Sequence, residues 1–151
     1  VAAALNAGLG LARGAYVARL DSDDLWHPLK LERQMTVARQ RPEAAFIYCF
    51  PRYIDSTGRV VFDAEPQKFP DRALARSLYE SLIGANSSAL IKSSAIEQVG
   101  GYDVSLASWE DWLLQLMVCS RHPLAFVPEY LTAYRIRPGS LSADPQNMLQ
   151  S

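Results

Sequence analysis

Three aspartates follow directly on an apolar run near the start of the chain, and this feature constrains the fold more than any other. The stretch YVARLDSDDLWHP, residues 16–28, places Asp21, Asp23 and Asp24 within four positions. Carboxylates this close repel one another unless a cation or solvent relieves them. The preceding residues, 15–20, predict a short buried strand. The acids therefore follow the carboxyl end of a strand, which is where open α/β sheets bind their ligands.

Strands and helices alternate along the whole chain. Apolar residues at helical spacing predict a helix over residues 1–13, with Gly14 as a left-handed stop, and a second helix between Pro28 and Arg41. Ser94 and Glu97 have capping-box spacing. Further strands are predicted at residues 44–50, 59–62, 86–92, 124–127 and 131–136, and further helices at 71–81, 94–99 (ended by Gly100 and Gly101) and 109–120. This alternation predicts an α/β layer architecture.

The composition limits the domain organisation and the class of partner. With 151 residues, 49% of them apolar and 21% charged, the chain has the composition of one globular domain. Its 15 basic residues against 16 acidic ones leave no basic excess for binding nucleic acid. No apolar stretch reaches the length of a membrane span. Cys49 and Cys119 lie in different predicted elements, and we expect them to be buried, reduced thiols.

The acidic loop is suited to a divalent cation. Asp21 and Asp23, two positions apart on a turn, can direct oxygen atoms to one point. Hard cations such as Mg²⁺ or Mn²⁺ take carboxylate oxygens together with phosphate oxygens, and such a cation would relieve the repulsion. A solvated turn in which Asp24 caps the next helix is the alternative, and both stay open. A calcium loop does not fit, because Leu25 and Trp26 stand where that loop needs a ligand and a glycine.

A second acidic pair, Glu110 and Asp111, opens the predicted helix at residues 109–120. Acids in a first turn interact favourably with the helix dipole, so helix stability alone can explain them. In the segment SWEDWLLQL, however, the apolar side chains can pack while the two acids project from the amino end. A carboxylate held there near a metal-bound substrate could act as a general base on a hydroxyl group.

Together these motifs resemble the inverting nucleotide-sugar glycosyltransferases of family 2, which have the GT-A fold. The segments that carry the resemblance are NAGLGLARGAYVARLDSDDLWHPLKLERQ, SSALIKSSAIEQVGGYD, SWEDWLLQL and YLTAYRIRPGSLS. They occur in the order found in the family. The resemblance implies a three-layer α/β/α domain over residues 1–142, followed by a tail at 143–151. It also implies a domain that is incomplete at its amino terminus, because the family's nucleoside-binding strands have no counterpart here.

The resemblance also implies roles for the acidic loop. Asp21 and Asp23 would bind Mn²⁺ or Mg²⁺ and the diphosphate of a nucleotide sugar, with Asp24 as the adjoining acid of the same cofactor-binding loop. Many members of the family have a histidine at the position of Arg137. An arginine cannot ligate a metal, but it can pair with phosphate, so Arg137 is either a phosphate contact or a plain surface arginine.

For the second acidic pair, the resemblance implies the chemistry of transfer. Asp111 would deprotonate an acceptor hydroxyl, which then attacks the anomeric carbon with inversion, and Glu110 would orient the acceptor or Asp111. The acceptor would be a glycan, a lipid-linked molecule or another hydroxyl compound. The QxxRW signature of processive synthases does not follow this motif, which favours a single transfer. Family members usually build cell-envelope polysaccharides or lipid-linked glycans, which implies a cytoplasmic enzyme in peripheral association with the inner face of the membrane.

Two rival functions belong to other classes. The chain could be a remnant that binds metal or nucleotide without catalysing transfer, since the nucleoside-binding strands are missing from it. It could also be a phosphatase of the haloacid dehalogenase type, in which the first aspartate of a DxD motif is the nucleophile. That class needs further residues in its own order, and the LWHP that follows DSDD fits it poorly.

Overall fold

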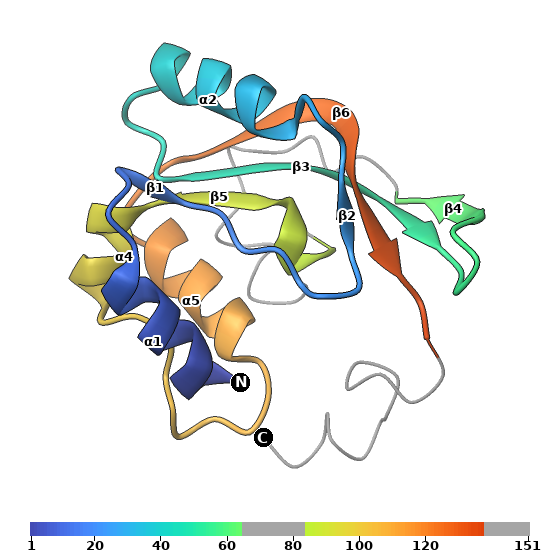
Figure 1. The fold of residues 1–151 in the computed structure, drawn as a ribbon. Helices are drawn as coiled ribbons and strands as arrows, with labels where there is room; N and C mark the ends of the chain where they lie inside the picture. Colours follow the sequence, from blue (N-terminus) through green and yellow to red (C-terminus); the bar gives the residue numbers. More distant parts are fainter. Residues whose placement is uncertain (65–83, 138–151) are drawn as a thin grey trace.

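Two long strands that run parallel to each other form the middle of the sheet (Figure 1). The structure is a computed structural model, and it describes residues 1–64 and 84–137. Its strands are β1 (Tyr16–Val17), β2 (Leu25–Trp26), β3 (Phe46–Ile54), β4 (Val60–Asp63), β5 (Ala89–Lys92) and β6 (Leu124–Arg135). Its helices are α1 (Ala2–Leu11), α2 (Lys30–Gln40), α4 (Ser93–Val99) and α5 (Glu110–Cys119), with a 3₁₀ turn, η2 (Asn86–Ser88).

The strand order is β1-β5-β3-β6-β2, and β4 pairs with the far end of β3. Only the β3–β6 pairing is parallel among the described strands; the other pairs are antiparallel. The predicted helix at residues 71–81 and the tail at 143–151 lie outside the described residues.

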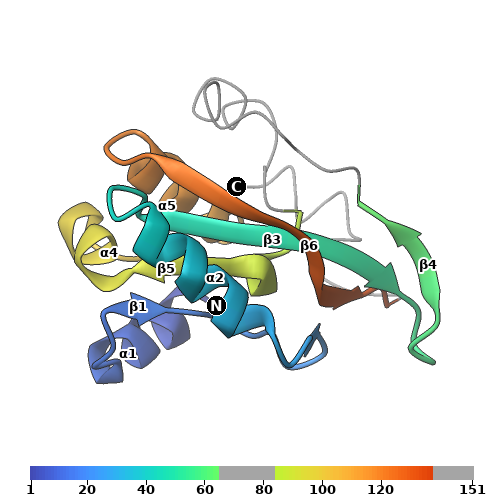
Figure 2. The ribbon, with the colours of Figure 1, turned by 90° about the horizontal axis from the view of Figure 1, so that it is seen from above.

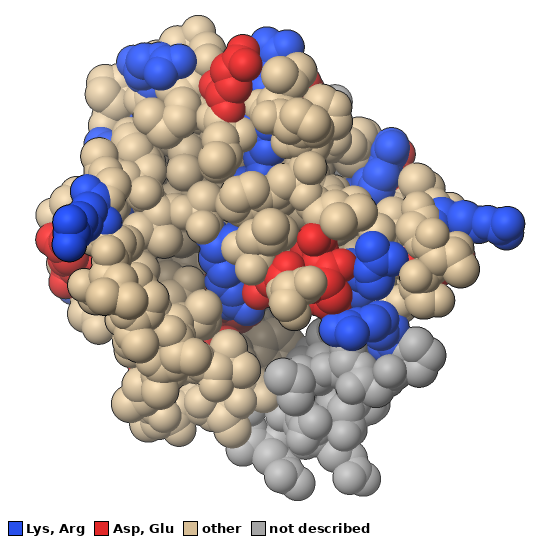
Figure 3. Space-filling model, in the orientation of Figure 1, with Lys and Arg blue, Asp and Glu red and all other residues tan. Residues whose placement is uncertain are grey.

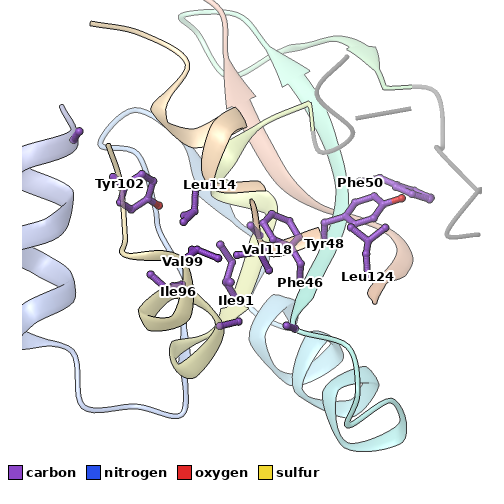
Figure 4. Close-up of a cluster of buried hydrophobic side chains, with 14 residues drawn as sticks. Phe46, Tyr48, Phe50, Ile91, Ile96, Val99, Tyr102, Leu114, Val118 and Leu124 are labelled. Atoms are coloured by element: carbon purple, nitrogen blue, oxygen red, sulfur yellow. The ribbon is translucent and has the colours of Figure 1, made fainter. Parts of the chain in front are cut away.

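Both faces of the sheet are covered by helices, which explains the unbroken apolar run of β3. Along that strand Phe46, Tyr48 and Phe50 belong to a core cluster with residues of α4 and α5, as Figure 4 shows. The intervening Ile47 packs on the other face, in a cluster with residues of α2. In Figures 1 and 2, α2 lies on one side of the sheet and α4 and α5 on the other. A strand buried on both faces needs apolar residues at every position, and the predicted three-layer α/β/α class is confirmed.

Several element boundaries differ from the prediction. Strand pairing within the predicted strand 15–20 is limited to β1, and β2 was not predicted because it is only two residues long. The predicted strand 86–92 begins as η2 and becomes extended only at β5. The two strands expected after residue 123 form one strand, β6, in spite of Pro128. Register shifts against β3 on either side of Phe50 take up this irregularity.

Two predicted helix boundaries are wrong. Helix α1 ends at Leu11 with an extended cap, and Gly14 does not have a positive φ. Gly14 is needed for a different reason, because a Cβ there would lie 3.0 Å from the carbonyl oxygen of Tyr16. Helix α4 starts without a side-chain cap, and the Ser93 hydroxyl donates to the carbonyl of Gly14 at 2.5 Å. Gly100 does end α4, with φ at 87° as predicted.

Candidate active site

The acidic loop is a tight turn between β1 and β2, and two of its carboxylates are paired with arginines. Arg19 Nε donates to Asp21 Oδ1 at 2.7 Å. On the other side of the loop, Arg137 Nη2 donates to Asp23 Oδ2 at 2.5 Å. The face of the molecule in Figure 3 shows acidic atoms gathered near the middle with basic atoms on both sides of them. The mutual repulsion expected from the sequence is thus relieved by two guanidinium groups.

Asp24, the third acid of the loop, is buried and bound by protein donors at both oxygens. Its carboxylate accepts from Ser87 Oγ at 2.6 Å and from the backbone N–H of Arg135 at 3.0 Å. Burial raises the pKa of Asp24, and these two hydrogen bonds oppose the rise. The alternative that Asp24 caps the next helix is wrong, because α2 begins after Leu29 without a side-chain cap. Asp24 instead anchors the loop to η2 and to β6.

Arg135 and Ser87 support the loop, and the sequence placed neither of them among the candidate site residues. Arg135 Nε donates to the carbonyl of Asp23 at 2.9 Å, and its Nη1 donates to the carbonyl of Asp55 at 2.9 Å. Ser87 Oγ accepts from the backbone N–H of Asp21 at 3.0 Å. Arg135 lies in the segment YLTAYRIRPGSLS that carries the family resemblance, where the sequence favours a structural role, whereas a serine in a predicted strand carries no such signal.

A buried lysine of α2 packs on Trp26, which follows the loop in β2. Lys30 is fully buried, its Nζ lies 4.3 Å from the centroid of the Trp26 ring, and it donates to Gln34 Oε1 at 2.7 Å. Burial lowers the pKa of Lys30 to about 8. The Trp26 indole N–H in turn donates to the carbonyl of Ser87 at 2.7 Å. Trp26 therefore joins η2 to the buried polar pair of Lys30 and Gln34 directly after the loop.

The second acidic pair lies at the start of α5, directly after a residue in an unusual conformation. Trp109 has φ at 67° and is the only non-glycine residue of the described ranges with a positive φ. Glu110 is only 7% exposed. The sequence predicted that its side chain projects from the amino end of the helix, but the structure buries it. Asp111 is half-buried, and its carboxylate accepts from Asn86 Nδ2 and, at 2.6 Å, from the backbone N–H of Trp112. Its carboxylate is therefore held in a defined orientation by neutral donors.

One pocket is lined both by Arg19, the partner of Asp21, and by Asp111 of α5. Its polar lining consists of Arg19, Asn86, Tyr102 and Asp111. Its apolar lining belongs to the core cluster on the α4 and α5 face of the sheet: Val17, Phe46, Ala89, Ile91, Ile96 and Leu114. Arg19 spans the two regions, because it pairs with Asp21 and also lines the pocket beside Asp111. Its Nη1 atom is buried and has no hydrogen-bond partner in the described part of the chain. An unpartnered guanidinium N–H at a pocket is a ready donor for an anionic or hydroxyl ligand.

The wall of the pocket at Tyr102 is fixed by a contact with α1. Asn6 Nδ2 donates to the carbonyl of Tyr102 at 2.8 Å, and the backbone N–H of Tyr102 donates to Asn6 Oδ1 at 2.9 Å. Gly101 is required beside it, since it has φ at 78° and a Cβ there would lie 2.8 Å from Asn6 Oδ1. The Gly-Gly-Tyr turn thus joins the first helix to the pocket.

The carboxylates of the loop fit a cation that is shared with substrate phosphates. Within residues 1–64 and 84–137, no three histidine, cysteine or acidic side chains converge as a metal site. Mg²⁺ and comparable ions, however, commonly take one or two carboxylates and complete their shell with phosphate oxygens and water. Asp21 and Asp23 are partly exposed, with side chains at 29% and 25%. They can supply those carboxylates if the arginines move aside.

The domain is a three-layer α/β/α sandwich with an acidic loop after β1 and an acid-bearing helix, α5. This is the GT-A architecture of nucleotide-sugar transferases. Two solved structures share this fold: residues 1–349 of TarS from S. aureus, at a TM-score of 0.64 and 16% identity, and the mannosyltransferase PcManGT from Pyrobaculum calidifontis, at 0.64 and 18%. The matches cover 86% and 95% of this chain and 38% of either neighbour. The chain belongs to the family described as glycosyltransferase like family 2, whose model matches residues 1–147.

Curated relatives of the chain include proteins named as glycosyltransferases. An uncharacterized glycosyltransferase of Methanocaldococcus jannaschii is 24% identical over 135 residues, which cover 89% of this chain and 46% of the relative. Another from Rickettsia prowazekii is 27% identical over 152 residues, covering 97% of the chain and 48% of the relative. The chain thus spans about half the length of these relatives. None of the helices in the described ranges is long and apolar enough to cross a membrane.

Proposed function

We propose that this chain carries the metal and acceptor side of an inverting glycosyltransferase, which moves a sugar from a nucleotide diphosphate to an acceptor hydroxyl. The observation that carries the proposal is the pocket in which Asp111 lies beside Arg19, the partner of Asp21. In support, a carboxylate that can accept a proton lines the same pocket as an arginine that pairs with the loop proposed to bind the charged leaving group. An inverting transfer needs both groups at one reaction centre.

Asp21 and Asp23 would bind Mn²⁺ or Mg²⁺ together with the diphosphate. When bound, the cation neutralises the negative charge that grows on the departing diphosphate. Arg19 and Arg137 already lie at these carboxylates, and each can turn to a phosphate oxygen once a cation takes its place. Asp24 would serve the same loop indirectly, by fixing its backbone. In support, neighbours with this fold were solved with UDP and with GDP-Man and Mn²⁺.

Asp111 would act as the general base. Its carboxylate takes the proton of the acceptor hydroxyl as that oxygen forms a bond to the anomeric carbon. The bond from the anomeric carbon to the diphosphate oxygen breaks on the opposite face, and its electron pair leaves with the diphosphate, which inverts the configuration. Glu110, buried beside Asp111 in the first turn of α5, would help to orient that carboxylate or the acceptor.

We also propose a class of acceptor and a cellular place for the reaction. The acceptor is a glycan, a lipid-linked molecule or another hydroxyl compound, and the absence of a QxxRW sequence after the acidic pair supports one transfer for each encounter. We place the reaction in the cytoplasm, at the inner face of the membrane. The nucleoside of the donor would be held by residues outside this chain.

The test is sugar transfer or donor hydrolysis with a panel of UDP- and GDP-sugars and Mn²⁺. It should be run on this chain and on a form extended at its amino end. Activity in the longer form alone would define the chain as one part of the enzyme, whereas binding of Mn²⁺ and nucleotide without turnover in both forms would support the remnant. Release of inorganic phosphate from simple phosphate esters would support the phosphatase.

A further inference from the structure

The turn formed by Asn86 and Ser87 touches both acidic regions at once. Asn86 Nδ2 donates to the carboxylate of Asp111. The next residue, Ser87, accepts from the backbone N–H of Asp21 at 3.0 Å and donates to Asp24 Oδ2 at 2.6 Å. Two consecutive residues therefore hold the general base on one side and the metal-binding loop on the other.

This turn is built into the centre of the sheet. The backbone N–H of Ser88 donates to the carbonyl of Ala85 at 3.0 Å, which closes the turn, and β5 follows immediately and pairs with β3. Ser87 is fully buried, and its carbonyl also accepts from the Trp26 indole N–H at 2.7 Å. A turn fixed in this way cannot shift toward one acidic region without moving relative to the other.

We propose that Asn86 and Ser87 are positioning residues that set the placement of the general base relative to the metal and diphosphate site. The proposal rests on the proposed function. Asn86 suits this role, because a neutral amide orients the carboxylate without cancelling its charge, as an ion pair with lysine or arginine would. Ser87 suits it because one hydroxyl both accepts from the loop backbone and donates to the buried acid of the loop.

Substitutions at Asn86 and at Ser87 should impair different steps. Partners that orient a metal ligand or a reacting group typically cost about 10- to 100-fold in metal affinity or activity when they are removed. Asn86→Ala is expected to lower kcat by about that factor, with KM for the donor and Mn²⁺ affinity unchanged. Ser87→Ala is expected to weaken Mn²⁺ and nucleotide binding by a similar factor, about 10-fold or more.

Ser88→Ala is the matched control. Its hydroxyl donates to the carbonyl of Ala85 at 2.6 Å, within the same buried turn. It should lower the melting temperature about as much as Ser87→Ala does and leave the split between kcat and Mn²⁺ affinity unchanged. Ser87→Cys, which keeps the size and a weak donor, should recover part of the Mn²⁺ affinity if Ser87→Ala folds poorly.

The experiment combines electron paramagnetic resonance of Mn²⁺ titrated with UDP or GDP, donor kinetics, and NMR of the Asn86 side-chain amide. We expect Asp111→Asn to shift that amide resonance and Ser87→Ala to leave it in place. Equal losses of kcat and Mn²⁺ affinity in Asn86→Ala, Ser87→Ala and Ser88→Ala would overturn the inference. Loss of transfer in Asp111→Asn with normal kcat in Asn86→Ala would overturn the inference alone. Normal transfer in Asp111→Asn would overturn the proposed function as well.

Discussion

The two acidic regions, the loop after β1 and the start of α5, are held by different kinds of partner. In the loop, Asp21 and Asp23 each face an arginine, and Asp24 is buried among protein donors. At the start of α5, the carboxylate of Asp111 is held by an amide and a backbone N–H, and among the described residues it forms no ion pair. Arginine side chains thus lie where a charged ligand is expected, whereas the groups that donate hydrogen bonds to Asp111 are neutral.

Breaking the α5 side should have the largest effect. Removing a general base typically costs about 10²- to 10⁴-fold, so Asp111→Asn should lower kcat for transfer by that range while Mn²⁺ binding stays intact. Asp63→Asn is the control, because Asp63 lies on β4, away from the pocket. Its Oδ1 accepts from Arg52 Nε of β3 at 2.9 Å. Near-normal transfer by Asp111→Asn, measured with a nucleotide sugar and Mn²⁺, would remove this residue as the base.

Within the loop, the buried acid and an exposed one should separate in stability. Asp24→Ala leaves the Ser87 hydroxyl and the Arg135 N–H without their acceptor, which should lower the free energy of unfolding by roughly 2–3 kcal/mol. Asp23→Ala removes only a partly exposed ion pair, worth about 0–1 kcal/mol. Urea unfolding of the two variants measures the difference. Equal losses would mean that Asp24 does not anchor the loop.

Raising the pH into the alkaline range should change the contributions of Lys30 and Cys119 to the free energy of unfolding in opposite directions. The pKa of Lys30, in α2, is lowered by burial to about 8, so above that pH the unfolded chain binds a proton that the folded chain lacks. Lys30 should therefore raise stability by about 1–2 kcal/mol between about pH 8 and pH 10. On α5, burial raises the pKa of the Cys119 thiol to about 12, which makes stability fall with pH through the same linkage.

Chemical unfolding at several pH values separates these two contributions. Lys30→Met should remove the rise, so that the difference in stability between the parent chain and Lys30→Met grows with pH. Cys119→Ala should reduce the fall, to which Cys49 also contributes because burial raises the pKa of its thiol. A difference between the parent and Lys30→Met that does not change with pH would show that Lys30 keeps an ordinary pKa.

The smallest effect should come from the exposed arginine of the loop. Arg137→Ala frees Asp23, and since such ion pairs are worth up to about 1 kcal/mol, Mn²⁺ alone should bind up to roughly 5-fold more tightly. Nucleotide diphosphate should bind more weakly to the same variant, because a phosphate contact is lost. Tighter binding of Mn²⁺ together with weaker binding of the diphosphate would support both roles of Arg137, as a competitor of the cation and as a phosphate contact. Weaker binding of Mn²⁺ alone would contradict a competition between Arg137 and the cation.

Patterns that repeat along the chain were readable without the structure. The apolar run at β3, the amphipathic spacing of α2 and the turn at Gly100 report burial and backbone conformation directly, and they gave the layer class correctly. Short elements were not readable. Strand β2 is two residues long and exists because Leu25 and Trp26 pair with Ala133 and Thr132 of β6. No local pattern of the sequence contains such a pairing.

For the site, the order of amino acids is enough to show which residues carry charge and where a base and a cation ligand could lie along the chain. It placed Asp21, Asp23 and Asp111 in motifs whose order matches the family. Which acids remain available for reaction depends on partners that are distant in sequence. Those partners are known only from the folded structure. Asn86 reaches Asp111, Ser87 and the backbone of Arg135 take up Asp24, and Arg137 pairs with Asp23 across 114 positions. These contacts form only when strands far apart in the chain meet in one sheet.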